Sequence, residues 1–161
     1  MTRAVIAFGA NLGDRETTIA AATRELATTK GVTLVAVSPV YETPAIKDAG
    51  VDRDAPGYLN GVVIVDTSLE PHALLDVLQA IESAHGRVRD EHWGDRTLDL
   101  DLIDLGGRVI ADDRLELPHP RAWQRAFVLQ PWLDVEPDAV LAGRGAVADL
   151  RVGAHDEVVR R

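Results

Sequence analysis

The sequence contains no cysteine among its 161 residues. This absence excludes disulfide bonds, thiolate metal sites and thiol nucleophiles, and it is typical of a protein from a reducing compartment. Long apolar runs are also missing. The opening run, residues 4–10, is too short to cross a membrane and is followed by a polar turn instead of a cleavage site for a signal peptide. We therefore expect a cytoplasmic protein in which any metal ion is bound by oxygen or imidazole.

Positive charge is scarce as well. The chain has 17 Lys and Arg against 26 Asp and Glu, a formal net charge of −9 with histidine neutral. General binders of nucleic acid and of anionic membranes need a basic surface, so we expect neither as a partner. With 46% hydrophobic and 27% charged residues, the composition is that of one globular domain over residues 1–161, and we take a monomer as the default.

Hydrophobic periodicity predicts strands and helices in alternation. Strands are expected at residues 3–8, 32–43, 58–67 and 97–105, and helices from Asp14 to Lys30 and from Pro71 to Gly86. This order is that of a ferredoxin-like βαββαβ core, an α/β sandwich of the α+β class with a mostly antiparallel sheet. We expect an irregular loop at residues 44–56, a short return strand around Val109 and Ile110, an extra helix at residues 121–133, and a mixed tail that covers the surface.

The expected fourth strand contains two aspartates, Asp99 and Asp101, that alternate with leucines. A period of two places both carboxylates on one face, about 6.6 Å apart along the strand. A solvated strand face would also explain the pattern. However, strands disfavour Asp, and like charges on one face repel unless a cation lies between them, which favours a Mg²⁺ site completed by water and nucleotide phosphates.

A glycine-bounded loop with several arginines, residues 86–97, precedes this strand. Arg87, Arg89 and Arg96 give the acidic chain a local basic site, and forked guanidinium donors match phosphate oxygens. The alternative is that these arginines form weak surface ion pairs with acidic neighbours in the loop. Arginines beside a carboxylate pair are the groups that phosphoryl transfer requires.

Few aromatic side chains are available to bind a flat ligand. Trp93 in the arginine loop, Tyr58 and Phe127 could each stack on a heteroaromatic ring, or could simply pack in the core. Asn60 could bind the amide edge of such a ring. His119, held between two prolines, suits either a phosphate contact or an ordinary loop hydrogen bond, and with Arg114 and Arg125 it forms a second polar group.

Six ordered blocks together resemble the 6-hydroxymethyl-7,8-dihydropterin pyrophosphokinase family of folate biosynthesis. The most specific block comprises residues 86–89 with 93–94 and 96–101, and the resemblance extends over nearly the whole chain. The others lie at residues 9–14, 41–44, 58–60, 117–120 and 127–131. The resemblance implies that diphosphate is transferred from ATP to the hydroxymethyl oxygen of the pterin, which leaves AMP.

The resemblance also implies roles for individual residues. Asp99 and Asp101 would hold two Mg²⁺ ions, and Arg87 and Arg96 would neutralise charge on the transferred group. Residues expected around ATP are Gln79, Glu82, Arg89, Trp93, Arg96, Leu102, Arg114, Leu115, Glu116, His119 and Arg125. Residues expected around the pterin are Gly9, Thr43, Pro44, Ile46, Tyr58, Asn60, Trp93 and Phe127.

Two other classes of function remain open from the residues alone. The expected strand order is shared by noncatalytic modules that bind RNA or sense small molecules, although the net charge disfavours RNA. A nucleotidyltransferase could also use the Asp99 and Asp101 pair, but it would release diphosphate instead of AMP. The identity of the product separates these possibilities.

Overall fold

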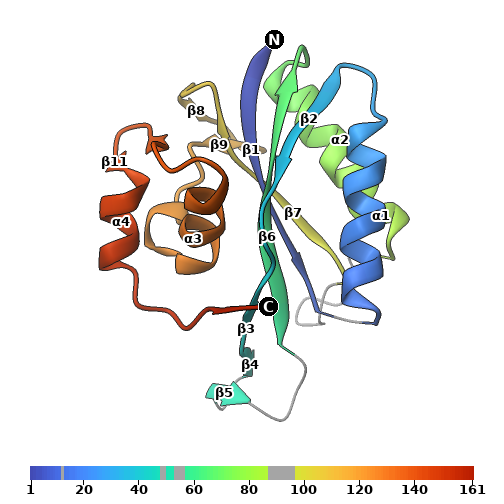
Figure 1. Ribbon diagram of the computed structural model, residues 1–161. Coiled ribbons are helices and arrows are strands. Elements are labelled where there is room, and N and C mark those ends of the chain that lie inside the picture. The colour runs from blue at the N-terminus through green and yellow to red at the C-terminus, as the bar shows by residue number, and fades with distance from the viewer. Residues whose placement is uncertain (12, 48–49, 53–56, 87–96) are drawn as a thin grey trace.

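One antiparallel sheet runs through the molecule, and helices cover both of its faces (Figure 1). The computed structural model describes residues 1–11, 13–47, 50–52, 57–86 and 97–161. The sheet has the order β12-β3-β6-β1-β7, and β2 also pairs with β6. Its strands are β1 (Thr2–Ala10), β2 (Val32–Val37), β3 (Tyr41–Thr43), β6 (Tyr58–Thr67), β7 (Asp99–Leu105) and β12 (Val159–Arg160).

The two faces of the sheet carry different helices and separate apolar clusters. Helices α1 (Arg15–Ala27) and α2 (Pro71–Ala84) pack on one face, and α3 (Ala126–Val135) and α4 (Val147–Gly153) lie against the other (Figure 1). Strand β1 contributes Ile6 and Phe8 to the first cluster and Val5 and Ala7 to the second. The alternation of side chains along one buried strand therefore builds both cores.

The order β1, α1, β2/β3, β6, α2, β7 confirms the ferredoxin-like core and the extra C-terminal helix. Strand β1 pairs antiparallel with β6 over its whole length, from Thr2 opposite Thr67 to Ala10 opposite Leu59. On its other edge β1 pairs antiparallel with β7. Among the described residues, no helix is long and apolar enough to span a membrane.

Several predicted element boundaries were wrong, each for a local reason. Helix α1 begins after Asp14, whose carboxylate accepts the N–H of Thr17 as expected, but it ends at Ala27 and not at Lys30. The Thr28 and Thr29 hydroxyls donate to carbonyl oxygens of the preceding turn, which satisfies groups that a longer helix would have bonded.

Two elements predicted as continuous are interrupted. The strand expected at residues 32–43 is split into β2 and β3 around Ser38, whose hydroxyl oxygen accepts the N–H of Val62 at 2.9 Å. The helix expected at residues 121–133 becomes a 3-10 turn, η1 (Ala122–Gln124), followed by α3, because Arg125 has an extended backbone conformation.

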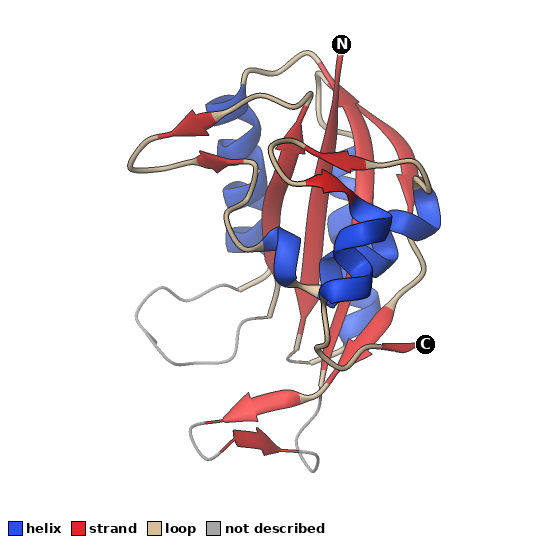
Figure 2. Ribbon diagram, turned by 90° about the vertical axis from the view of Figure 1, so that its left-hand side faces the viewer, coloured by secondary structure: helices blue, strands red, loops and turns tan. Residues whose placement is uncertain are grey.

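Segments outside the main strands also form short hairpins. The loop expected at residues 44–56 contains β4 (Ala45–Lys47) paired with β5 (Gly50–Asp52), which projects beyond the end of the sheet (Figures 1 and 2). The expected return strand is β8 (Ile110–Ala111), but it pairs with β9 (Glu116–Leu117) and not with the sheet. The tail contains β10 (Val140–Leu141) paired with β11 (Gly145–Ala146) before it ends in β12.

Candidate active site

The two aspartates of β7 face the layer of α3. In the register of the sheet, Asp99 lies opposite Gly9 and Asp101 lies opposite Ala7, which belongs to the apolar cluster beneath α3. The leucines that alternate with them are buried on the other face, beneath α1 and α2. Asp99 is half-buried and Asp101 is exposed, so the predicted carboxylate pair lies on one face and is accessible.

This face opens into a cavity of about 570 Å³. The cavity brings together residues from β1, β3, β6, β7, the start of α3 and the C-terminal tail. Its lining consists of Ala7, Phe8, Gly9, Thr43, Pro44, Tyr58, Asn60, Asp99, Asp101, Arg125, Phe127, Val128, Asp156 and Glu157. A single space therefore contains both predicted metal ligands and most of the residues that were expected around the pterin.

One row of residues across the sheet builds the polar floor of the cavity. Asn60 on β6 lies opposite Gly9 on β1, and Gly9 lies opposite Asp99 on β7. Asn60 is buried, and its amide nitrogen donates to the Thr43 hydroxyl at 2.9 Å. A Cβ atom on Gly9 would lie 3.2 Å from the Asn60 amide oxygen, so the missing side chain of Gly9 leaves room beside this amide.

Aromatic and cationic groups form the wall. Tyr58 and Phe127, which come from β6 and α3, are both partly exposed and both line the cavity. The guanidinium of Arg125 lies 5.5 Å from the centre of the Phe127 ring, within the range of a cation–π contact. The cavity lining therefore combines two aromatic rings and a positive charge with the two aspartates.

His119 lies beside β7 and is held by the backbone on both sides. The backbone N–H of His119 donates to the Ile103 carbonyl oxygen at 2.9 Å, and its imidazole Nδ1 accepts a hydrogen bond from the backbone N–H of Arg121 at 3.2 Å. Burial lowers the pKa of His119, the carboxylate of Asp101 opposes that shift, and the positive charges of Arg125 and Arg121 add to it. The imidazole is therefore close enough to Asp101 to sense its charge, and its burial favours the neutral form.

A second group of polar residues joins α2 to the β8–β9 hairpin. Arg114 contacts the Asp76 carboxylate at 2.6 Å and the Gln79 amide oxygen at 3.2 Å. His72 lies 2.7 Å from Asp112 across the same boundary. These contacts hold the hairpin, which carries the predicted ATP-side residues 114–116, against the helix.

Comparison with known proteins shows the family of the chain. The family model described as 7,8-dihydro-6-hydroxymethylpterin-pyrophosphokinase (HPPK) matches residues 5–137. The chain belongs to this family. It is 43% identical over 153 residues to the 2-amino-4-hydroxy-6-hydroxymethyldihydropteridine pyrophosphokinase of Methylorubrum extorquens, covering 93% of this chain and 94% of that one. It is 41% identical over 159 residues to the enzyme of the same name from Pseudomonas aeruginosa, covering 99% and 96%.

Solved structures show the same fold at much lower sequence identity. The chain matches the crystal structure of Plasmodium falciparum HPPK-DHPS wild type with SDX-DHP with a TM-score of 0.70 and 15% identity. The match covers 94% of this chain and 43% of the Plasmodium chain, so the chain described here corresponds to less than half of the Plasmodium protein. At this identity the likeness concerns the fold alone.

Several residues expected from the resemblance to the pyrophosphokinase family are not in the cavity lining. Gln79, Glu82, Leu102, Arg114, Leu115, Glu116 and His119 lie on α2, on β7 or in the segment that follows β7. Arg87, Arg89, Trp93 and Arg96 lie outside the described residues. The backbone of Ile46 belongs to β4, at the pterin side of the expected site.

Two acidic residues in the cavity were not predicted from the sequence. Asp156 and Glu157 lie in the weakly patterned tail, and the family match ends before them, at residue 137. They reach the cavity because β12, which begins two residues after Glu157, pairs with β3. No periodicity or motif in the tail could have revealed this contact.

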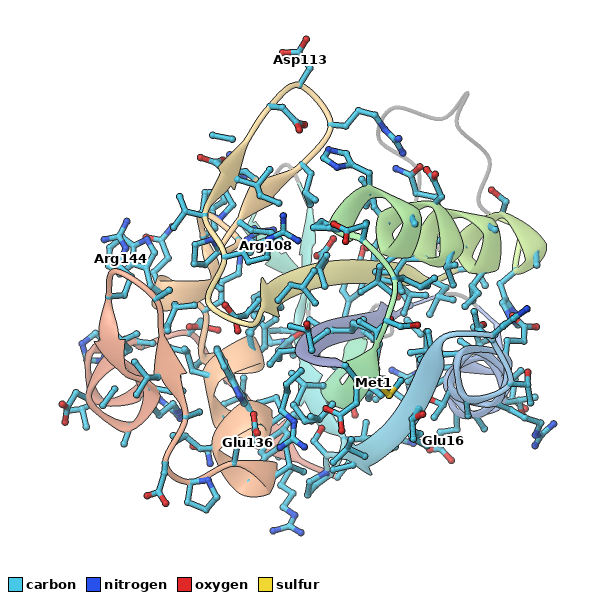
Figure 3. The ribbon with its side chains drawn as sticks, turned by 90° about the horizontal axis from the view of Figure 1, so that it is seen from above. Met1, Glu16, Arg108, Asp113, Glu136 and Arg144 are labelled. Carbon is cyan, nitrogen blue, oxygen red and sulfur yellow. The ribbon has the colours of Figure 1, made fainter. Side chains whose placement is uncertain are left out.

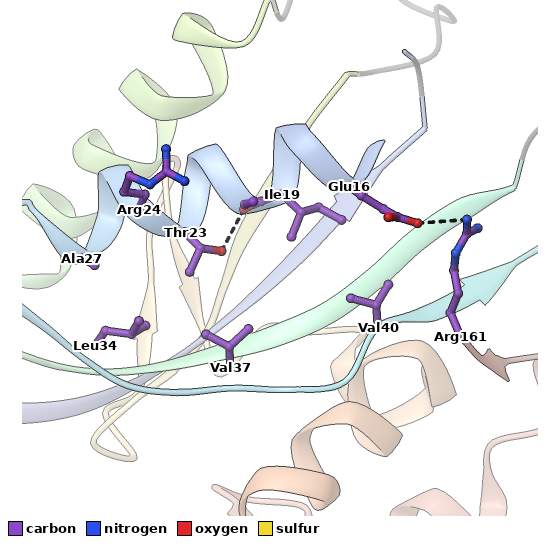
Figure 4. A pocket seen from close by; sticks show the side chains of 10 residues that line it. Glu16, Ile19, Thr23, Arg24, Ala27, Leu34, Val37, Val40 and Arg161 are labelled. Carbon is purple, nitrogen blue, oxygen red and sulfur yellow. Dashed lines mark hydrogen bonds and ion pairs between the residues drawn. The ribbon is translucent and has the colours of Figure 1, made fainter. Parts of the chain in front are cut away.

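A second cavity lies on the other side of the molecule's central sheet, between α1 and β2 (Figure 4). It measures about 710 Å³ and is lined mainly by apolar side chains such as Ile19, Leu34 and Val37. None of the residues expected to bind ATP or the pterin lines it. The chemical groups that suit phosphoryl transfer therefore belong to the first cavity.

Proposed function

We infer that the cavity lined by Asp99 and Asp101 is where this enzyme carries out its reaction. Members of its family are pyrophosphokinases, and the enzyme transfers diphosphate from ATP to 6-hydroxymethyl-7,8-dihydropterin in folate biosynthesis. The products are AMP and the pterin diphosphate. The observation that carries the assignment of the site is the shared cavity of two carboxylates, two aromatic faces and Asn60.

The pterin is proposed to bind between Tyr58 and Phe127. A flat heteroaromatic ring gains dispersion and stacking energy between two aromatic faces, and both side chains line the cavity. The amide of Asn60, which offers a donor and an acceptor, would bind the edge of the ring next to Gly9. Backbone groups near Thr43, Pro44 and Ile46 would complete the edge contacts.

The residues of β7 fit magnesium. Mg²⁺ prefers hard oxygen ligands and is commonly bound by one or two carboxylates together with water and phosphate oxygens. Among the described residues, no group of three or more His, Asp or Glu could hold a metal ion. We propose that Asp99 and Asp101 are ligands and that water and phosphate oxygens complete the coordination. Bound Mg²⁺, of which we propose two ions, would offset negative charge on the triphosphate.

The remaining residues are proposed to orient ATP. Arg87 and Arg96 would contact the transferred group, and Arg125 would approach it from the pterin side. Gln79, Glu82, Arg89, Trp93, Leu102, Arg114, Leu115, Glu116 and His119 would surround the nucleotide. The hydroxymethyl oxygen would then attack the β-phosphorus in line, the bond from that phosphorus to the AMP oxygen would break, and the hydroxyl proton would pass to solvent water.

This reaction requires no covalent intermediate on the protein. Phosphoryl transfer depends mainly on positioning the reactants and on neutralising charge, and each effect can contribute several kcal/mol to lowering the barrier. A chain without cysteine is therefore no obstacle to the chemistry. We further propose that the chain acts in the cytoplasm as a single-domain monomer. The elution volume in size-exclusion chromatography would test whether it is a monomer.

One assay tests the proposal. The protein is mixed with ATP, Mg²⁺ and reduced hydroxymethylpterin, and nucleotide products are separated by chromatography. We expect AMP to form only when the pterin is present. Release of free diphosphate would indicate a nucleotidyltransferase, and ADP or no product would contradict the proposed transfer.

A further inference from the structure

The first turn of α3 is capped by a residue that lies thirty positions away. Arg125 occupies the N-cap position, where Ser, Thr, Asp or Asn usually accepts a hydrogen bond, and its side chain makes no capping hydrogen bond. Instead, the N–H of Ala126 donates to Oδ1 of Asp156 at 2.8 Å, and the N–H of Phe127 donates to Oδ2 at 3.3 Å. A carboxylate at this end also interacts favourably with the helix dipole.

This arrangement links the cap directly to the cavity wall. Arg125 occupies the cap position, and Phe127 donates the second hydrogen bond that the Asp156 carboxylate accepts. Arg125 and Phe127, which both line the cavity, therefore belong to the capped turn. Without such a partner, the first N–H groups of a helix bond to water or the first turn frays. Asp156 therefore fixes the backbone from which a guanidinium and an aromatic ring enter the site.

The segment that carries Asp156 is itself held at its other end. We call residues 154–161 the terminal strap. Beyond Asp156 the strap pairs with β3 through β12, and the guanidinium of Arg161 lies 3.0 Å from Glu42 on β3. Arg161 also lies 2.9 Å from Glu16 on α1 (Figure 4). At the start of the strap, the guanidinium of Arg151 donates to the Ala154 carbonyl oxygen at 3.0 Å, so contacts on both sides of Asp156 determine where the strap places it.

We propose that Asp156 is a positioning residue for the pterin half of the active site, acting through Phe127 and Arg125. The proposal rests on the assignment of the pterin to the cavity between Tyr58 and Phe127. It goes further because the strap lies outside residues 5–137, the span that matches the family. The strap thus contributes to the wall of the substrate pocket although the family model ends before it, whereas the alignment with the Pseudomonas aeruginosa enzyme extends over 99% of the chain.

The test compares the Michaelis constants of the two substrates. In Asp156→Ala both acceptors are lost, and we expect the KM for the pterin to rise on the order of fivefold or more, because a ring displaced by a fraction of an ångström binds poorly. The KM for ATP should rise less than the KM for the pterin, because only Arg125 in the capped turn was also expected around ATP, whereas residues such as Gln79 and Arg114 are held by contacts elsewhere. Asp156→Asn keeps one acceptor oxygen and should give an intermediate pterin KM.

A matched control and a second background complete the experiment. Asp138 is an exposed aspartate that does not line the cavity, and Asp138→Ala should leave both constants unchanged. In a Phe127→Leu background, Asp156→Ala should raise the pterin KM much less than in the wild type, because residues that act as a unit are not additive.

The outcomes distinguish this inference from the proposed function. A wild-type chain that forms no pterin-dependent AMP would overturn both. An active wild type whose Asp156→Ala and Asp156→Asn variants keep the wild-type pterin KM would overturn only the role of Asp156, even if their melting temperatures fall. If Asp156→Ala does not fold, the pterin KM of Asp156→Asn decides the question alone.

Discussion

The carboxylate of Glu82 accepts a hydrogen bond from the backbone N–H of Leu100 at 2.9 Å. Glu82 lies in the last turn of α2 and is only 4% exposed, and Leu100 lies between Asp99 and Asp101 on β7. The contact therefore ties the helix to the strand at the point where the two aspartates project toward the opposite face. It indicates that Glu82 supports the site by holding β7.

Glu82→Ala should destabilise the protein and disturb the aspartate pair. The buried N–H of Leu100 would lose its acceptor, which costs about 1–3 kcal/mol of unfolding free energy. Glu82→Gln keeps an acceptor oxygen and should lose less. Urea unfolding measures both losses, and the Mg²⁺ concentration for half-maximal rate should rise in the same order. An alanine variant as stable as the wild type would show that the hydrogen bond contributes nothing.

Asp99→Asn and Asp101→Asn should remove activity without removing the fold. We expect turnover to fall on the order of a hundredfold or more, because each carboxylate would be needed to hold Mg²⁺ against the triphosphate. AMP formation measures the rate, and circular dichroism checks the fold. Asp113, at the tip of the β8–β9 hairpin and directed away from the body of the molecule (Figure 3), provides the control Asp113→Asn. Unchanged turnover in either variant would contradict the metal assignment.

Two glycines on neighbouring strands should respond differently to alanine. A Cβ atom on Gly61 would lie 2.3 Å from the Phe8 ring, inside the core, so Gly61→Ala should cost about 3 kcal/mol or more of unfolding free energy. At Gly9 the Cβ would meet the Asn60 amide oxygen at 3.2 Å. Gly9→Ala should therefore cost much less stability than Gly61→Ala, while raising the pterin KM. Thermal unfolding and steady-state kinetics separate the two effects, and equal melting temperatures would refute the contrast.

Asp104 on β7 should make stability depend on pH. Burial raises the pKa of Asp104 above its usual value of 3.8, and within the described residues its Oδ1 is buried without a hydrogen-bond partner. Because the folded-state pKa is the higher one, this group contributes less stability as the pH rises from about 3.8 through the raised value.

The variant Asp104→Asn cannot ionise at this position, so it does not lose stability through this group as the pH rises. Relative to wild type, its unfolding free energy should increase between pH 3.5 and pH 7, with a gain on the order of 1 kcal/mol at the upper end. Urea unfolding of both proteins across this range measures the difference, in which the other titrating groups cancel. A difference that does not change with pH would mean that Asp104 is not destabilised by ionisation.

Local patterns predicted the order of the elements but not all of their ends. The apolar run at residues 58–67 gave β6 with the observed bounds, and Asp14 marked the start of α1. Pro39, which has no N–H for the ladder, could have predicted the break after Ser38, but no local pattern specifies the hydrogen bond between the Ser38 hydroxyl and Val62 on a partner strand. Two-residue strands such as β12 have no periodicity to detect and depend on the strand beside them.

For the site, the sequence by itself determined that Asp99 and Asp101 share a face, because the period of two along a strand follows from covalent geometry. The motifs of the chain likewise identified its family. Only the tertiary structure decided that this face turns toward α3, because that choice depends on the register with β1 and on which helices pack on each side. It also brought Asp156 to the start of α3, because no local pattern specifies a hydrogen bond between residues thirty positions apart.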